Sequence, residues 1–167
     1  MAILNQQFEW SDFKSNPDLR NAYQGTPAKT LLPRDRLLCR FITTESKARG
    51  VRGNEIYLGP WWTEWRSTVK LLNKWQAAAT TPKEVLRAKL ALTRGFSQEL
   101  DGLVQIVLTQ PVYAWKGIAR HQEDTLLKVT YMGGGEQLFL PNLASDRTGE
   151  KSTVAHFHCF SWVDSLS

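Results

Sequence analysis

Residues 132–142 read Met-Gly-Gly-Gly-Glu-Gln-Leu-Phe-Leu-Pro-Asn, and this stretch constrains the fold more than any other in the chain. Three consecutive glycines lead directly into a strand-like run that begins with the polar residues Glu136 and Gln137. Because glycine lacks a Cβ atom, such a turn allows the backbone to come close to a ligand. The pattern predicts either a plain glycine-rich hairpin or a turn that brings two polar side chains to a binding site.

The glycines match neither of the common nucleotide-binding patterns. A phosphate-binding loop has the form G-x-x-x-x-G-K-[ST], and the dinucleotide-binding turn has the form G-x-G-x-x-G. Neither pattern occurs in this chain. A Rossmann cofactor site is therefore disfavoured.

The sequence on both sides of this stretch is typical of strands. From residue 103 onward, apolar runs alternate with clusters of Gly, Pro, Asn and Asp, as in short strands joined by turns. These runs cover residues 103–108, 112–115, 126–131, 137–140 and 153–163. The C-terminal half is therefore predicted to be mostly antiparallel sheet.

The N-terminal half combines helices with two short strands. A first helix is expected after Asn16-Pro17, followed by strands at residues 36–43 and 55–58. A second helix, capped by Thr63, would carry Trp65, Val69 and Leu72 on one face. A third begins at the capping box Thr81-Pro82-Lys83-Glu84, and its apolar face is Val85, Ala88, Leu92 and Phe96. Helices followed by strands predict an α+β fold with one or two antiparallel sheets. The early strands are expected to join the later ones.

Length and composition indicate one domain over residues 1–167. The hydrophobic fraction is 42% and the charged fraction 22%, which are ordinary values for a globular protein. No apolar run is long enough to span a bilayer, and the first residues do not form a signal-peptide core. Cys39 and Cys159 lie in apolar runs, which favours buried free thiols over a disulfide. We expect a soluble, cytoplasmic protein without a membrane partner.

Arg40 lies among Leu37, Leu38, Cys39, Phe41 and Ile42. An arginine in such a strand needs a negatively charged partner, because burying an unpaired charge is costly. The partner is either an internal carboxylate, such as Glu45 or Glu55, or a phosphate-bearing ligand held by the guanidinium group.

Large aromatic residues surround Gly59-Pro60, namely Tyr57, Trp61 and Trp62. Their rings either belong to the core or stack on a nicotinamide, an adenine or a nucleic-acid base. The net charge of +5, the pI near 9.4 and the seven tryptophans keep a different class open, a module that binds nucleic acid or protein without catalysis. The basic residues between 47 and 52 are expected to be exposed.

Metal and hydrolase motifs are weak. His156 and His158 fall on one face of a predicted strand, but no C-x-x-C or H-E-x-x-H pattern accompanies them. No G-x-S-x-G elbow marks a hydrolase nucleophile. We predict no metal site.

Taken in order, three segments resemble the ADP-ribosyltransferase-like bacterial toxin fold, including its NAD-glycohydrolase branch. Leu38-Cys39-Arg40-Phe41 is similar to the first core strand of that family, which carries an NAD-contacting arginine. Residues 112–122 resemble its strand-to-turn run. Residues 135–141 resemble its later strand, in which Gln137 occupies the place of the family's catalytic glutamate, as in some NAD-hydrolysing members.

The resemblance implies specific roles for these residues. Arg40 would clamp the diphosphate of NAD, Tyr57 or Trp61 would wall the nicotinamide, and Gly134 and Gly135 would allow close backbone approach. Glu136 or Gln137 would hydrogen-bond the ribose and orient the attacking water or acceptor. NAD would be consumed as a substrate, and no resident cofactor or metal is implied.

The implied activity is ADP-ribosyltransferase or NAD glycohydrolase. The implied partners are NAD, a protein or nucleic-acid acceptor of ADP-ribose, and a neutralising immunity protein. The resemblance implies a toxin-like effector that acts in the cytoplasm and that a specialised secretion system could deliver.

Overall fold

The structure is a computed structural model, and it describes residues 2–13, 15–16, 19, 21–42, 57, 59–75, 81–90, 102–125, 127–145 and 151–163. The elements in chain order are the 3-10 helix η1 Trp10–Phe13, β1 Ala28–Leu32, β2 Leu37–Ile42, β3 Trp61–Glu64, α3 Trp65–Trp75, α4 Pro82–Lys89, β4 Gly102–Leu108, β5 Val112–Ile118, β6 Gln122–Asp124, β7 Val129–Tyr131, β8 Glu136–Phe139 and β9 Ala155–Trp162. This confirms the predicted α+β class.

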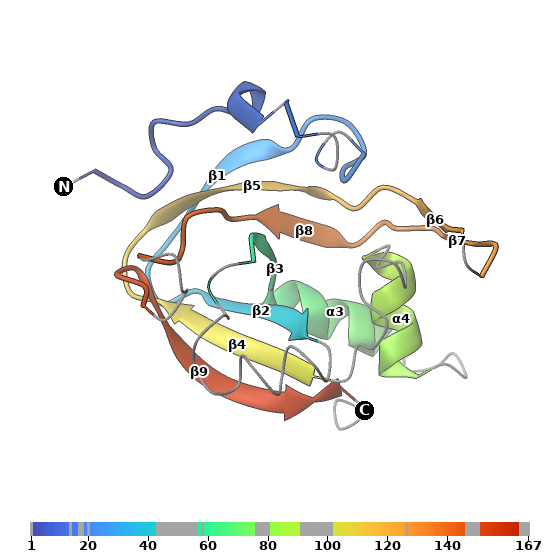
Figure 1. Cartoon of the computed structure of the whole chain (residues 1–167). Helices are drawn as coiled ribbons and strands as arrows, with labels where there is room; N and C mark the ends of the chain where they lie inside the picture. Colours follow the sequence, from blue (N-terminus) through green and yellow to red (C-terminus); the bar gives the residue numbers. More distant parts are fainter. Residues whose placement is uncertain are drawn as a thin grey trace.

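The main sheet has seven strands among the described residues, in the order β1-β5-β8-β3-β2-β4-β9, and every strand pair is antiparallel. Figure 1 shows β1, β5 and β8 in one half, β2, β4 and β9 in the other, and the short β3 between them. The hairpin β6–β7 extends away from the body. The predicted strands β2 and β8 therefore belong to one sheet but do not pair with each other, because β3 lies between them.

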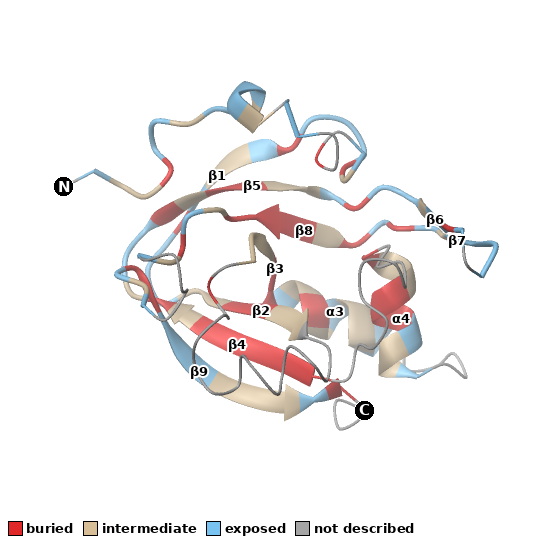
Figure 2. Ribbon diagram, viewed as in Figure 1, coloured by how far each residue is buried: buried red, intermediate tan, exposed pale blue. Residues whose placement is uncertain are grey.

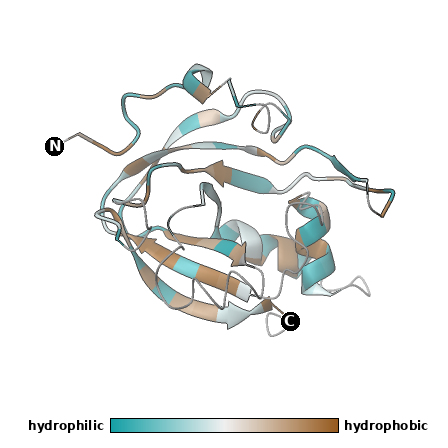
Figure 3. Ribbon diagram, viewed as in Figure 1, coloured by the Kyte–Doolittle hydropathy of each residue, from teal (hydrophilic) through white to brown (hydrophobic). Residues whose placement is uncertain are grey.

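The sheet folds over one large core. Alternate residues of both halves meet there, including Leu38 of β2, Ile106 of β4, Ala114 of β5 and Leu138 of β8. We call the face that carries these side chains the inner face. Figure 2 shows how strongly β4 and β8 are buried, and Figure 3 shows that β8 begins hydrophilic and ends hydrophobic.

The opposite, outer face of the sheet has two smaller clusters. An aromatic cluster forms around Trp115 and Phe139, and N-terminal residues cover it: Phe8, Trp10, Phe13, Leu19, Ala22 and Tyr23. Helices α3 and α4 cover Cys39 and Leu103. Successive residues of a strand point to opposite faces, and here the core covers the inner face while these clusters cover the outer one. Both faces of the central strands are therefore buried. This accounts for their almost continuous apolar composition.

Helix α4 is fixed at both ends. At its start Thr81 and Glu84 form the predicted capping box, with the Thr81 hydroxyl accepting from the Glu84 amide and the Glu84 carboxylate accepting from the Thr81 amide. At its end the carbonyls of residues 88, 89 and 90 accept from Gly133 N, Gly135 N and Gln137 Nε2 at 2.9, 2.8 and 3.1 Å. The glycine-rich turn therefore serves as the partner of the helix C-terminus.

Other sequence expectations met mixed outcomes. β1, β3 and β6 were not predicted, and β7 is shorter than the strand expected at residues 126–131. Thr63 lies in β3, where its hydroxyl contacts Thr68 and the buried thiol of Cys39. Of the helix expected after Asn16-Pro17, Leu19 is helical, but residues 21–25 form turns and bends in which Tyr23 bridges to Ala119, so the helix does not extend to Gly25. The basic segment 47–52 lies outside the described residues, and of the strand expected at 55–58 only Tyr57 is described, in a turn.

Both cysteines are free, as predicted, and burial raises the pKa of the Cys39 thiol to about 11. In the part of the chain that is described, no helix is both long and apolar enough to cross a membrane.

Two adjacent glycines provide a matched test of the turn. Gly133 and Gly134 have φ values of +73° and +99°, so an alanine at either position is strained by about 1–2 kcal/mol. A Cβ at Gly133 would also overlap the Ala119 carbonyl, whereas a Cβ at Gly134 meets nothing within 4 Å. Gly133→Ala should therefore lower the free energy of unfolding by about 1–3 kcal/mol more than Gly134→Ala, as measured by urea denaturation. Equal losses would contradict this packing.

Candidate functional site

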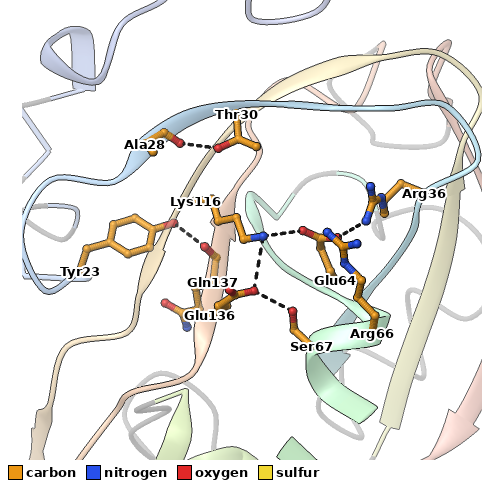
Figure 4. Close-up of polar contacts among 10 residues, drawn as sticks. All are labelled: Tyr23, Ala28, Thr30, Arg36, Glu64, Arg66, Ser67, Lys116, Glu136 and Gln137. Atoms are coloured by element: carbon orange, nitrogen blue, oxygen red, sulfur yellow. Dashed lines mark hydrogen bonds and ion pairs between the residues drawn. The ribbon is translucent and has the colours of Figure 1, made fainter. Parts of the chain in front are cut away.

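Glu64 is the centre of a charged cluster on the inner face. Its side chain is only 2% exposed. Its Oε1 accepts from Lys116 Nζ at 3.0 Å, and its Oε2 accepts from Arg36 Nη1 at 2.7 Å. Arg66 Nε forms an ion pair with the same Oε2 at 2.9 Å. Figure 4 shows these three cations converging on one carboxylate: Lys116 from β5, Arg36 from the position just before β2, and Arg66 from α3.

The cations decide the charge of Glu64. Burial by itself would raise the pKa of the Glu64 carboxyl, because it disfavours the charged form. The hydrogen bond from Lys116 and the charges of Lys116, Arg36 and Arg66 outweigh burial, so that the pKa lies below its ordinary value. Glu64 is therefore a carboxylate at neutral pH, and it holds its three partners in fixed positions.

Glu136 is the second carboxylate of this cluster. Its Oε2 accepts from Ser67 Oγ at 2.8 Å and lies 3.5 Å from Lys116 Nζ. Lys116 pairs with Leu138 in the sheet, and Glu136 is two residues from Leu138, so both charged side chains share the inner face. Unlike Glu64, Glu136 is 43% exposed. It is an oriented carboxylate that remains open to a ligand.

Gln137 points the other way. Its amide nitrogen donates to the Leu90 carbonyl at 3.1 Å, and its backbone carbonyl accepts from the Tyr23 hydroxyl at 3.2 Å. Trp61 is also on the outer face, with its ring 5.8 Å from that of Tyr23 and 5.3 Å from that of Phe139. The structure therefore brings neither Gln137 nor Trp61 to the face that carries Glu136.

Arg40 does share the inner face, because it is two residues from Leu38, which pairs with Glu64. Its guanidinium lies 5.5 Å from the centre of the Trp62 ring and so close to Gly59 that a Cβ there would overlap it. Burial lowers the pKa of Arg40 to about 10. The carboxylates considered as its partners, Glu45 and Glu55, lie outside the described residues.

Tyr57 is buried in the same inner core as Trp62, and burial raises the pKa of its hydroxyl. Gly134 is exposed with open space around its Cα. Gly135 is buried, and a Cβ there would lie 3.0 Å from the Lys89 carbonyl and the Leu90 side chain. Of the predicted site residues, Arg40, Tyr57 and Glu136 are thus on the inner face.

Sequence reasoning missed Glu64 and the roles of Arg36, Ser67 and Lys116. A usable signal existed at Lys116, a charged residue within the apolar strand at 112–118, of the kind that drew attention to Arg40. His156 and His158 are exposed on β9. No group of three potential ligands that could hold a metal ion occurs among the described residues.

Comparison with known proteins adds a fold relationship. No family model and no curated protein matches the chain. The solved structure of Tne2 in complex with Tni2 is similar, with a TM-score of 0.56 and 15% identity over 84% of this chain and 96% of that chain. The structure of Tse6 in complex with Tsi6 gives a TM-score of 0.44 and 17% identity, covering 93% and 87%. The similarity to Tne2 shows a shared fold.

The charge of Glu64 makes stability depend on pH. Because its folded pKa lies below the ordinary value of 4.5, the stabilisation is complete above that value and is lost as the pH falls through the folded pKa. Glu64→Gln leaves three cations without their carboxylate, so the free energy of unfolding at pH 7 should fall by about 3 kcal/mol. The variant should also lose less stability than the wild type between pH 5 and pH 3, a difference that urea denaturation would measure.

The matched control is Glu123→Gln, which changes an exposed carboxylate of β6. It should leave both the stability at pH 7 and its pH dependence nearly unchanged. If Glu64→Gln behaved like this control, the cluster would not be a structural constraint.

Proposed function

We propose that this chain is an ADP-ribosyltransferase-like enzyme that cleaves NAD at the bond between nicotinamide and ribose, as a glycohydrolase or a transferase. The observation that carries the proposal is the carboxylate of Glu136, which Ser67 and Lys116 hold in place while 43% of the side chain stays exposed. A dinucleotide site needs an oriented polar group near the ribose and cations for the phosphates. Both kinds of group lie on the inner face.

The chemistry fits such a carboxylate. As the C–N bond breaks, nicotinamide leaves with the bonding electron pair, and positive charge develops on the ribose. A fixed carboxylate stabilises this charge and can accept a hydrogen bond from a ribose hydroxyl. The oxygen of water, or an acceptor atom, then bonds to the ribose carbon and loses its proton to the carboxylate or to solvent. Glu136 is the proposed catalytic residue.

The remaining predicted residues have supporting roles in this proposal. Arg40 and Tyr57 would contact NAD from the inner face, with Gly134 at the exposed side of the turn. Gln137, Gly135 and Trp61 would act from the outer face by fixing the strands that carry the site, because their contacts are with α4 and the aromatic cluster. Catalysis therefore rests on Glu136 more than on Gln137.

The shared fold with Tne2 is consistent with this proposal. That structure contains Tne2 together with Tni2. By analogy, a protein partner that neutralises this chain belongs to the proposal, as do a protein or nucleic-acid acceptor and delivery by a secretion system.

The test is an assay in which the purified chain is incubated with NAD and released nicotinamide is measured by chromatography. Glu136→Gln should lower turnover by about 100-fold or more, because it removes the charge while keeping the shape. The melting temperature should change little, because the side chain is half exposed. Glu123→Gln is the control and should keep full activity. Wild-type protein that releases no nicotinamide, with or without a cell extract to supply an acceptor or activator, would refute the enzymatic proposal.

A second candidate function is binding of single-stranded nucleic acid without catalysis. Phe157 and Trp162 on β9 are 46% and 48% exposed, the exposed His156 and His158 flank Phe157, and the chain has a net charge of +5. Exposed rings on a basic protein can stack on bases.

This alternative makes its own prediction. Trp162→Ala should weaken binding of a fluorescent single-stranded oligonucleotide by about tenfold, since one stacked base contributes about 1–3 kcal/mol. Binding should also weaken steeply with salt. Unchanged affinity in Trp162→Ala, or the lack of any salt-sensitive binding, would exclude this function.

A further inference from the structure

We propose that Arg36, Arg66 and Lys116 form a binding site for the diphosphate group of a nucleotide, and that the buried Glu64 organises it. The assignment rests on the proposed function only in naming a nucleotide as the ligand. This site is distinct from Arg40, the residue to which the sequence assigned the diphosphate, whose guanidinium lies against Trp62 and Gly59.

The first argument is the charge balance. Arg36 Nη1 donates to Oε2 of Glu64, and Arg66 Nε is paired with the same oxygen at 2.9 Å, so two guanidinium groups share one oxygen and lie close together. Lys116 is bound to the other oxygen and also lies 3.5 Å from Glu136. Three positive groups thus surround two carboxylates. The cluster has an excess of positive charge, which a bound anion would balance.

The second argument is the number of hydrogen-bond donors. A guanidinium has five N–H groups in a planar fork that suits phosphate. Toward Glu64, Arg36 uses Nη1 and Arg66 uses Nε. Arg66 is 59% exposed, and Arg36 and Lys116 are 23% and 26% exposed. Further N–H groups on these cations are within reach of a ligand from solvent.

The third argument is preorganisation. A long cationic side chain loses rotamer freedom when it binds a ligand, and this loss weakens binding. Glu64 already fixes all three cations through contacts of 2.7 to 3.0 Å. The N-terminus of α3, which begins at Trp65 and contributes Arg66 and Ser67, adds its own positive potential at this point. The carboxylate therefore acts as a support for an anion site.

The position of the three cations also fits the proposed catalytic role of the neighbouring Glu136 carboxylate. Lys116 contacts both Glu64 and Glu136, so the proposed diphosphate site adjoins the proposed catalytic residue (Figure 4). In a dinucleotide the reacting ribose is attached directly to the diphosphate. A ligand held by Arg36 and Arg66 would therefore have this ribose near Glu136.

The experiment is calorimetric titration of the purified chain with inorganic pyrophosphate and, separately, with ADP-ribose. Arg66→Gln is the test variant, because Glu64 keeps Arg36 and Lys116 and the fold should persist, as a melting curve would confirm. Both ligands should bind Arg66→Gln at least tenfold more weakly than wild type. Arg34→Gln is the matched control, since Arg34 is 71% exposed and pairs with Asp35, and it should bind like wild type.

The inference is overturned if pyrophosphate and ADP-ribose bind wild type and Arg66→Gln equally, or if wild type binds neither at millimolar concentration. Binding of pyrophosphate without ADP-ribose would also overturn it, because the site would not accept a nucleotide. If both ligands bind through Arg66 while NAD releases no nicotinamide, the diphosphate site stands and the proposed cleavage fails. If nicotinamide is released and Arg66→Gln changes neither affinity, the cleavage stands and this site fails.

Discussion

The buried carboxylate of Glu64 is the constraint on which the arrangement of the sheet depends. A charge that is 2% exposed must be compensated, and its partners come from residues far apart in the chain. Arg36 precedes β2, Lys116 lies on β5, and Arg66 lies on α3. A buried ion cluster adds little net stability, but it is costly to break. It therefore specifies how the two halves of the sheet and helix α3 face each other.

Strand β8 links this cluster to the rest of the fold by using both of its faces. On the inner face Glu136 meets Ser67 and Lys116, and on the outer face Gln137 and the glycine turn satisfy the last carbonyls of α4. By binding Gln137 and the turn, the helix helps to fix the position of the neighbouring carboxylate of Glu136. Two of the three glycines that suggested a ligand-binding turn, Gly133 and Gly135, thus have a structural role at the end of α4.

Local patterns predicted much of this fold. The apolar runs at residues 103–108 and 153–163 became β4 and β9, and the Thr81–Glu84 capping box opened α4. These signals lie within a few neighbouring residues. The short β3 could not be found in this way, because its four residues are strand only through pairing with β2 and β8. Glu64 was missed for the same reason.

The face of the sheet to which each side chain points was equally hard to predict. Glu136 and Gln137 are both polar, so the sequence could not indicate which one points inward, and the two tryptophans of β3 posed the same problem. Register decided both: Glu136 and Trp62 lie on the inner face, Gln137 and Trp61 on the outer face. Arg40 was correctly singled out as an arginine in an apolar strand. Its contact with NAD, and NAD cleavage itself, remain predictions.

The strand order also has a consequence for how the chain folds during its synthesis. β8 lies between β5 and β3, and residues 138 and 139 pair with residues 61 and 62. Pairing over such a separation closes a long loop and is slow. While a ribosome is still making the chain, the two halves of the sheet have no strand to join them until residue 139 has emerged. Translation must therefore pass residue 139 before the cations around Glu64 can come together.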